Sequence, residues 1–353
     1  SRGRRQARGG TADLGPVAER LGAKRVNGGG LPNSTRELAR LRKEKCLPIR
    51  LRAINASTSW PELEKEMAAL DVGHFPLELL PALTNLVLTN GGGPLLRWIF
   101  KSPAPSPASL NGEWNRVRAC EGSQPSVLLI NSARPEALVR AAVVNSLQHG
   151  TRIYSLATTS LPVDDQVGLL LRNSRFTQFG LEEFVELADA LGIECPCEER
   201  LTAVPEVGEA IAELVQTLPF PPCGLVVTMG ETGMVIYDAQ KGCICHVGLS
   251  REGRAATRNY LRPDKIPGIG DRTFAALVLA YDTTTVAPES SRLVRAARQA
   301  WADVLQGSGP FLQPKPVWFQ VTVLKCGCFG VRWTQLPLAQ IAQPDVGWSE
   351  QAL

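Results

Sequence analysis

The middle and C-terminal parts of the sequence alternate between strand-like and helix-like stretches, and this alternation limits the possible folds more than any other feature. Apolar runs at 126–131 and 152–157 indicate buried strands, and the period of the apolar residues at 135–148 indicates a helix between them. We expect a third strand at 168–172. Strands that alternate with helices of this length form βαβ units. The sequence therefore predicts an α/β fold with a mostly parallel sheet covered by helices.

Further elements extend this pattern on both sides. The stretches 83–89 and 95–100 are joined by Asn90-Gly-Gly-Gly93, which indicates a hairpin. A second hairpin is expected near the end of the chain, turning at Cys326-Gly-Cys328. We divide the chain into a basic flexible arm (1–26), one large domain (27–315) and a C-terminal hairpin and tail (316–353). The other expected elements are helices at 34–42, 181–191, 206–217, 271–281 and 289–305, and strands at 83–89, 95–100, 224–229, 234–237, 317–324 and 329–333.

Basic residues are concentrated at the start of the chain. Residues 1–55 hold 14 Lys or Arg against 4 Asp or Glu, a balance of +10, so the remaining 298 residues carry −6 of the net +4. A stretch so rich in Arg and Gly cannot bury enough apolar surface to offset its ordering entropy, which predicts a mobile arm. Such an arm attracts RNA. A solvated tail or the remainder of a targeting segment would have the same composition.

The expected location follows from this composition. Although the chain is 44% hydrophobic, its longest apolar run, at 274–280, is far shorter than the roughly 18 residues of a membrane-spanning helix. We therefore expect no membrane partner. The acid-poor, Arg-rich start predicts an intracellular and specifically mitochondrial protein.

Two glycines precede the expected helix 271–281, which begins with an aspartate. Glycines ahead of a helix let backbone amides approach a ligand closely, and the helix start adds partial positive charge. Such an anion hole suits the charge that develops on a transferred phosphoryl group, and Asp271 would take the proton from an attacking hydroxyl. The alternative is an ordinary loop in which Asp271 caps the helix. The segment is Gly268-Ile-Gly270-Asp271.

Two other glycine-rich segments accompany this one along the chain. One precedes the expected helix 34–42, which a Ser34–Glu37 capping box begins, and the other is a tight turn after the strand 224–229. In order and spacing the three segments resemble the motifs of the ribokinase/PfkB family of sugar and nucleoside kinases, nearest to its pseudouridine-kinase branch, over 27–310. The matching residues are Gly28, Gly29 and Asn33, then Thr228, Gly230 and Gly233, then Gly268, Gly270 and Asp271.

The resemblance implies ATP-dependent phosphorylation of a sugar or nucleoside hydroxyl, with ATP and Mg²⁺ as cofactors. It implies a ribokinase-like αβα sandwich with a mostly parallel central sheet and a small β-lid, formed by the hairpin at 83–102. The implied roles are substrate binding for Gly28, Gly29 and Asn33; nucleotide binding for Asn173, Thr228, Gly230 and Gly233; and catalysis for Asp271 as general base with Gly268 and Gly270 as the anion hole.

The sequence also departs from the family pattern. The family's N-x-x-E motif, whose Glu organises magnesium, matches Asn173-Ser-Arg-Phe176, which ends in Phe. Lys265 stands where the family has an Asp before the base, and no strand can be predicted before Gly28, where the family opens with a strand bearing a substrate-binding Asp. With fewer carboxylates, Mg²⁺ would depend on the phosphate oxygens.

Two functions therefore remain open. The first is a kinase with full or weakened activity. The second is a catalytically degenerate pseudokinase that serves as a structural or assembly component of an organellar ribonucleoprotein, such as a mitochondrial ribosome, with the arm on RNA and the C-terminal tail on a partner protein.

Six of the nine cysteines form three C-x-C pairs. Zinc sites usually use C-x₂₋₄-C spacing, so we predict no metal site and interpret these residues as core or turn positions. The alternative is that two of these pairs lie close together in the fold and bind a metal or form a disulfide. The pairs are Cys195/Cys197, Cys243/Cys245 and Cys326/Cys328.

Overall fold

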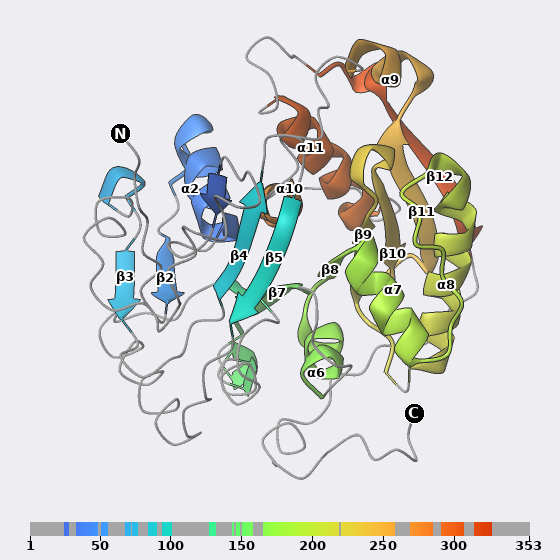
Figure 1. Ribbon diagram of the computed structural model, residues 1–353, viewed down its shortest axis with the longest axis horizontal. Coiled ribbons are helices and arrows are strands. Elements are labelled where there is room, and N and C mark those ends of the chain that lie inside the picture. Colours follow the sequence, from blue (N-terminus) through green and yellow to red (C-terminus); the bar gives the residue numbers. More distant parts are fainter. Residues whose placement is uncertain are drawn as a thin grey trace. The chain divides into compact units, whose positions relative to one another are not determined.

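A computed structural model gives the fold, shown in Figure 1. The chain divides into two compact units: Ser1–Ser109 with Arg262–Ala275, and Leu110–Leu261 with Ala276–Leu353. The structure describes residues 25–27, 33–48, 51–55, 68–71, 73–76, 84–89, 94–100, 127–131, 143–144, 146–148, 150–157, 165–218, 220–257, 269–284, 291–306 and 314–326.

The second unit is built around a seven-stranded sheet with the order β12-β11-β10-β9-β8-β7-β6. Strands β6 to β9 are parallel to one another, and β9 to β12 continue the sheet as antiparallel neighbours. The strands are β6 (Val127–Asn131), β7 (Arg152–Leu156), β8 (Thr177–Gly180), β9 (Gly224–Thr228), β10 (Met234–Asp238), β11 (Cys243–Leu249) and β12 (Phe319–Cys326).

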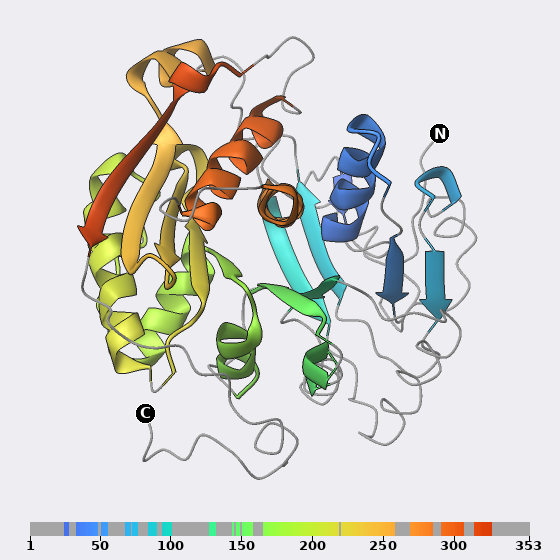
Figure 2. The same cartoon turned by 180° about the vertical axis from the view of Figure 1, so that it is seen from behind.

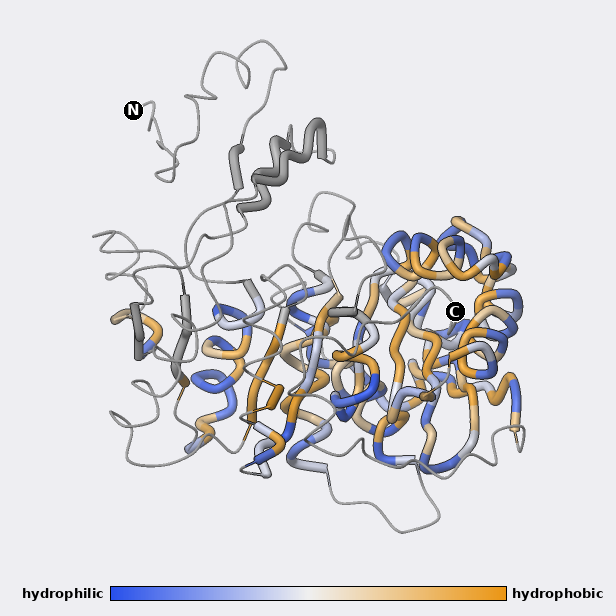
Figure 3. The backbone as a smooth tube through the Cα atoms, turned by 90° about the horizontal axis from the view of Figure 1, so that it is seen from below, coloured by the Kyte–Doolittle hydropathy of each residue, from blue (hydrophilic) through white to orange (hydrophobic). Residues whose placement is uncertain are grey.

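Helices cover both faces of this sheet. Figures 1 and 2 show α7 (Leu181–Ala190) and α8 (Val204–Thr217) over one face and α11 (Arg292–Gln306) over the other. The core between α7, α8 and the sheet is closed by fully buried side chains such as Phe184, Ile211 and Val227. Figure 3 shows hydrophobic and hydrophilic residues alternating along these helices, as amphipathic helices require. The predicted α/β sandwich with a mostly parallel sheet is confirmed.

Several predicted elements of this unit are present with shifted ends, and one is wrong. Residues 168–172, predicted as a strand, belong to α6 (Asp165–Asn173). A short run of leucines is compatible with a buried helix as well as with a buried strand. The spacing of its apolar residues therefore could not distinguish a helix from a strand. The predicted helix end at Gly192 is confirmed, because Gly192 has φ +71° and its amide bonds the carbonyl of Asp189 at 3.0 Å.

The end of the large domain was placed too early. Strand β12 pairs with β11 along its whole length, so the sheet continues past residue 315 to Cys326. What we assigned to a separate C-terminal hairpin therefore begins as the edge strand of the central sheet. The predicted second strand of that hairpin, 329–333, lies outside the described residues.

The first unit holds a three-stranded sheet with the order β1-β4-β5. The predicted hairpin is confirmed, since β4 (Thr84–Thr89) and β5 (Pro94–Phe100) pair in antiparallel fashion. Strand β1 (Arg25–Asn27) pairs with β4, which corrects our expectation that no strand precedes Gly28 and assigns the last two residues of the predicted arm to a strand. The arm's residues 1–24 lie outside the described residues.

One helix and a second, two-stranded parallel sheet complete this unit. The sheet consists of β2 (Arg52–Asn55) and β3 (Gly73–Pro76). Helix α2 (Asn33–Glu44) buries Leu38, Ala39 and Leu41 on one face. Its buried Arg42 guanidinium donates to the carbonyls of Leu70 and Asp71 at 2.7 and 3.0 Å, which fixes the end of α2 to the turn before β3. Among the described helices of both units, none has the length and apolar character that crossing a membrane requires.

Candidate functional site

The segment that contains Asp271 is folded differently from the prediction. Helix α10 (Ile269–Thr283) begins two residues before the predicted start at 271, so Gly270 and Asp271 lie in its first turn. Asp271 is therefore too far into the helix to be its N-cap, which removes that alternative. Amides in a first helical turn have no partner within the helix, and they carry the positive end of its dipole. This turn can therefore favour an anion.

The space beside Gly270 is open. A Cβ atom built on Gly270 would meet no heavy atom of the described residues within 4 Å. By contrast, a Cβ on Gly253, in the short helix α9 (Arg251–Thr257), would lie 2.3 Å from the carbonyl oxygen of Trp318. Packing therefore explains the glycine at 253 but does not explain the one at 270. Both Gly270 and Asp271 are half-buried.

The beginnings of α2 and α10 lie next to each other in the first unit. The Nε of Arg272 is 4.0 Å from Oε2 of Glu37, and the other carboxylate oxygen of Glu37 accepts a hydrogen bond from Arg40 at 2.9 Å. Glu37 is four residues after Asn33, and Arg272 directly follows Asp271. The structure thus brings together the helices that follow two of the three predicted motifs. The side chain of Asn33, together with Gly28, Gly29 and Gly268, lies outside the described residues.

The third motif forms a turn at the carboxyl end of β9 in the second unit. The Oγ1 of Thr228 donates to the carbonyl of Phe179 at 3.1 Å, which joins the ends of β8 and β9. Gly230 and Gly233 have φ of +50° and +109°, and a Cβ on Gly233 would lie 2.2 Å from the carbonyl oxygen of Val247. The turn needs both glycines for its backbone conformation, and needs the second also for close packing on β11.

Carboxylates cover the backbone at this end of the sheet. An oxygen of Glu199 lies 2.2 Å from the position of a Cβ on Gly230, and an oxygen of Glu183 has the same distance at Gly180. Although Glu199 is exposed, partial desolvation of its carboxylate raises its pKa, and the nearby carboxylates of Glu182 and Glu231 raise it further. Sequence reasoning missed these acidic residues, although Gly180-Leu-Glu-Glu183 places a Glu three residues after the end of a strand.

Asn173 does not lie near the Thr228 turn. It ends α6, and its Nδ2 donates to the carbonyl of Leu169 at 2.8 Å. Thr228 is the last residue of β9, whereas Asn173 precedes the first residue of the parallel strand β8. The structure therefore places Asn173 and the Thr228 turn at opposite ends of the same strands. Their expected grouping around one nucleotide is wrong, because residues 168–172 form a helix and the next strand begins only at Thr177.

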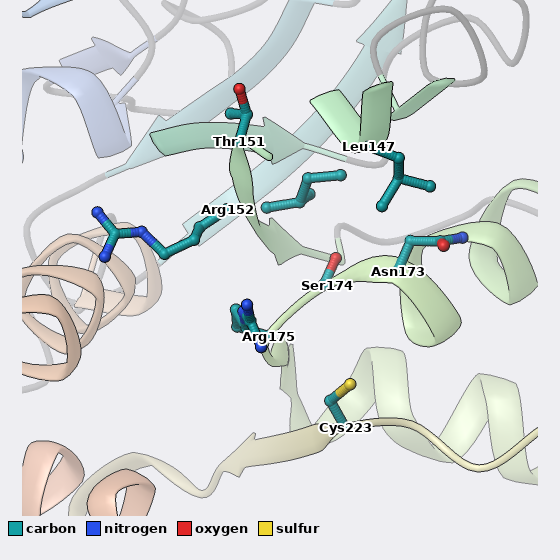
Figure 4. Close-up of a pocket in the computed structure, with 8 residues that line it drawn as sticks. Leu147, Thr151, Arg152, Asn173, Ser174, Arg175 and Cys223 are labelled. Carbon is teal, nitrogen blue, oxygen red and sulfur yellow. The ribbon is translucent and has the colours of Figure 1, made fainter. Parts of the chain in front are cut away.

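A small pocket lies near Asn173, at the amino ends of the parallel strands (Figure 4). Its volume of about 30 Å³ is large enough to hold water. Phe176, which we had aligned with the family's Glu, packs against the rings of Tyr154 and Tyr281 at 5.0 and 5.8 Å and belongs to the core. The residues that line the pocket are Leu147, Thr151, Arg152, Ile153, Asn173, Ser174, Arg175 and Cys223.

The described residues contain no group of three His, Cys, Asp or Glu side chains placed to hold a metal ion.

Comparison with known proteins identifies the fold. No protein-family model matches the sequence, and no curated protein matches it. Among solved structures, the ribokinase from Giardia lamblia has a TM-score of 0.54 at 13% identity, covering 81% of this chain and 83% of that one. The adenosine kinase of Trypanosoma brucei brucei has a TM-score of 0.54 at 13% identity, covering 79% and 82%. This chain therefore has a ribokinase-like α/β fold.

A third similar structure contains a bound ligand. The adenosine kinase of Anopheles gambiae, in complex with P1,P4-di(adenosine-5) tetraphosphate, has a TM-score of 0.51 at 12% identity, covering 80% of this chain and 81% of that one. At this level of identity the likeness establishes the fold and leaves activity to be argued from the residues themselves.

Proposed function

We propose that this chain is a phosphotransferase of the ribokinase/PfkB kind, which transfers the γ-phosphoryl group of ATP to a hydroxyl group of a sugar or nucleoside. The observation that carries the proposal is the first turn of α10, where no described residue fills the space beside Gly270 and Asp271 follows directly. The ribokinase-like fold supports the same reaction class, because the similar structures are those of a ribokinase and of adenosine kinases.

Each part of this turn has a chemical role in the proposal. The carboxylate of Asp271 accepts the proton of the acceptor hydroxyl, whose oxygen then attacks the γ-phosphorus as ADP leaves. General base catalysis of this kind is worth roughly 10²–10⁴ in rate. The backbone amides at Gly268 and Gly270, aided by the helix dipole, stabilise the negative charge on the transferred group.

The start of α2 supplies the acceptor side of the proposed site. Gly28 and Gly29 would approach the substrate through bare backbone, and the Asn33 amide would bind its hydroxyl groups. The contact between Arg272 and Glu37 supports this assignment, because it holds α2 beside the first turn of α10.

The nucleotide is assigned to the carboxyl ends of β8 and β9, in the turn that Thr228, Gly230 and Gly233 form. Ligands in open α/β sheets bind at the carboxyl ends of the strands, which supports this end over the one where Asn173 lies. When bound with ATP, Mg²⁺ would neutralise phosphate charge. Glu183 is the carboxylate that we assign to orient its water ligands, in place of the residue sought at Phe176.

An acceptor-dependent assay tests the proposal. The purified chain is incubated with Mg·ATP and ribose, fructose, adenosine or pseudouridine in turn, and ADP release is measured. We expect release with at least one acceptor, and a fall of about 10²–10⁴ for Asp271→Asn. Asp189→Asn, an exposed position on α7, is the matched control and should keep the wild-type rate. ADP release that is independent of acceptor and equal in both variants would contradict the proposal.

One observation favours a second function, that of a non-catalytic component of an organellar ribonucleoprotein. The Glu199 carboxylate covers Gly230, where the phosphates of a nucleotide would approach, and a negative group there repels them. In this alternative the arm binds RNA and the C-terminal tail binds a protein in a mitochondrial particle. The absence of any thermal shift with Mg·ATP, together with salt-dependent RNA binding, would favour it over the kinase.

A further inference from the structure

Strands β11 and β12 carry three cysteines at the same end of the central sheet. Cys243 and Cys326 are directly opposite each other in the antiparallel register. The Sγ of Cys245 is hydrogen-bonded to the Sγ of Cys243 at 3.8 Å. Cys326 is exposed, whereas Cys243 and Cys245 are buried. Nothing in the proposed phosphoryl transfer uses these thiols.

A β-bulge is what places Cys326 opposite Cys243. Ile244 pairs with Lys325 and Cys245 pairs with Val323, so Leu324 is an extra residue in β12. Leu324 lies against α8, since a Cβ on Gly208 would be 2.9 Å from its Cδ1. The neighbouring Lys325 also reaches α8, where its Nζ is 2.6 Å from Oε2 of Glu209. Because two successive residues turn toward α8, Cys326 returns to the opposite face, on the side of Cys243.

This arrangement meets the geometric demands of a disulfide. Directly opposed residues of an antiparallel pair have Cα atoms about 4.5–5.5 Å apart, inside the range of roughly 4.4–6.8 Å that disulfides need. A metal centre is the weaker interpretation, because no group of three metal-binding side chains is found among the described residues. The exposed position of Cys326 gives a small oxidant access to the pair.

We propose that Cys326 and Cys243 form an oxidant-sensitive thiol pair that closes to a disulfide between β12 and β11. A peroxide oxidises the Cys326 thiol to a sulfenic acid and is itself reduced, releasing one water when the oxidant is hydrogen peroxide. The Cys243 sulfur then attacks the sulfenic sulfur, forming the S–S bond and releasing a second water. The two thiols lose two electrons and two protons in all. A dithiol reductant reverses the reaction.

Cys245 contacts the proposed pair through its hydrogen bond with Cys243 but does not take part in the disulfide. The hydrogen bond that Cys245 shares with Cys243 lowers the pKa of Cys245, whereas burial and the nearby Cys326 and Asp238 raise it. Because its thiol is buried, Cys245 is shielded from the oxidant and is not needed for the bond. The disulfide would fix the last described residue of the edge strand to its neighbour, at the point where the chain continues into the C-terminal tail.

Peptide mapping of the full-length protein tests this proposal. After treatment with a stoichiometric amount of hydrogen peroxide, we expect the loss of two of the nine thiols and a cross-linked peptide joining Cys326 to Cys243. Dithiothreitol should restore both thiols. Cys326→Ser should abolish the cross-link, and since the residue is exposed this variant should fold normally. Cys245→Ser should retain the cross-link, as should the control Cys46→Ser, which removes another exposed thiol.

Other outcomes would overturn it. These are a bond between Cys243 and Cys245 that persists in Cys326→Ser, a bond from Cys326 to any other cysteine, or conversion of Cys326 to sulfinic acid without a bond. A stoichiometric zinc ion that protects these thiols from peroxide would also overturn it, and would indicate a metal site instead.

Discussion

Gly270 stands inside a helix, and within the part of the chain that the structure describes no atom would meet a Cβ at this position. Replacing it with alanine removes backbone freedom from the unfolded chain, so Gly270→Ala should raise the free energy of unfolding by up to about 1 kcal/mol. The added methyl group would fill the open space of the proposed anion hole, so acceptor-dependent ADP release should fall. Urea unfolding and the ADP assay measure the two effects.

The control for this substitution is Gly253→Ala, which should lower stability because its Cβ would strike the Trp318 carbonyl. A Gly270→Ala variant that is more stable and fully active would show that the open space has no part in the reaction.

Glu199 makes the stability of the second unit depend on pH. Its pKa is raised in the folded state by partial desolvation and by Glu182 and Glu231, so between its ordinary value of 4.5 and the raised value the folded protein binds more protons than the unfolded chain. The free energy of unfolding therefore falls as pH rises through this window. Glu199→Gln should flatten this dependence and stabilise the protein at neutral pH.

Urea unfolding at several pH values between 4.5 and 8 measures this effect. The exposed Glu213→Gln on α8 is the matched control and should leave the pH profile unchanged. A pH profile of Glu199→Gln that follows the wild type would contradict the role of Glu199 in the pH dependence. The same variant also tests whether removing the negative charge beside Gly230 strengthens nucleotide binding.

At this scale, sequence reasoning located Asp271 at the start of a helix, because the apolar stretch that follows it could be predicted as helical. The catalytic role of Asp271 stays a prediction. Asn173 was misassigned because N-x-x-E is a short pattern and its meaning depends on which end of a strand it occupies. The residues around Asn173 do not show which end of a strand it occupies. That depends on whether the leucine run before it is a strand or a helix, and in the structure it is a helix.

Among the elements, α2 is held by one buried charge. The guanidinium of Arg42 bonds two backbone carbonyls and lies 3.1 Å from Oδ2 of Asp71. Hydrogen bonds to charged groups are worth about 1.5–3 kcal/mol, and Arg42→Met keeps the apolar stem while removing every donor. We expect it to lower the free energy of unfolding of this unit by that amount.

Arg40→Met is the matched control, because Arg40 is exposed and pairs only with Glu37 among the interactions described for it. Exposed pairs of this kind are worth up to about 1 kcal/mol. Hydrogen exchange of the α2 amides separates local from global unfolding. Equal effects of the two substitutions would contradict the anchoring role of Arg42.

The elements most easily predicted were those with both a period and a boundary signal, such as the β4–β5 hairpin with its glycine turn and α7 with Gly192 at its end. Two strands of the central sheet were missed. Strand β8 has only four residues, and β11 reads as Cys-Ile-Cys-His-Val-Gly-Leu without alternation because it is buried on both faces. A continuous run of this kind carries no period that separates strand from loop.

At the scale of the molecule, the uneven distribution of charge predicts where RNA would bind. Removing residues 1–24, which precede β1, deletes six basic side chains and leaves the described elements intact. If the arm binds RNA, this deletion should weaken binding and flatten the dependence of log Kd on log salt concentration, since fewer counterions are released.

Filter binding at several salt concentrations measures this slope. Deletion of residues 340–353, which contain no Lys or Arg, is the control and should leave the slope unchanged. An identical slope for the chain without its arm would exclude the arm as the RNA contact.

The fold class was predictable because alternating strands and helices permit few arrangements, and the seven-stranded layered sheet confirms it. The extent of that sheet could not be predicted. Helices α9, α10 and α11 separate β12 from β11 in the sequence, so the pairing of these strands is a long-range contact. That α2 and α10 lie close together was predicted from the order of the motifs. This order implies a shared site but gives no distance between the helices.

Phosphorus NMR of a single turnover tests the central claim that Asp271 and the first turn of α10 serve phosphoryl transfer. With excess enzyme, Mg·ATP and the acceptor identified by ADP release, a phosphomonoester signal should grow as the γ-phosphate signal decays. Asp271→Asn should slow this growth by about 10²–10⁴ while ATP still binds. A phosphomonoester formed equally fast by Asp271→Asn, or no transfer from ATP that is demonstrably bound, would contradict the account.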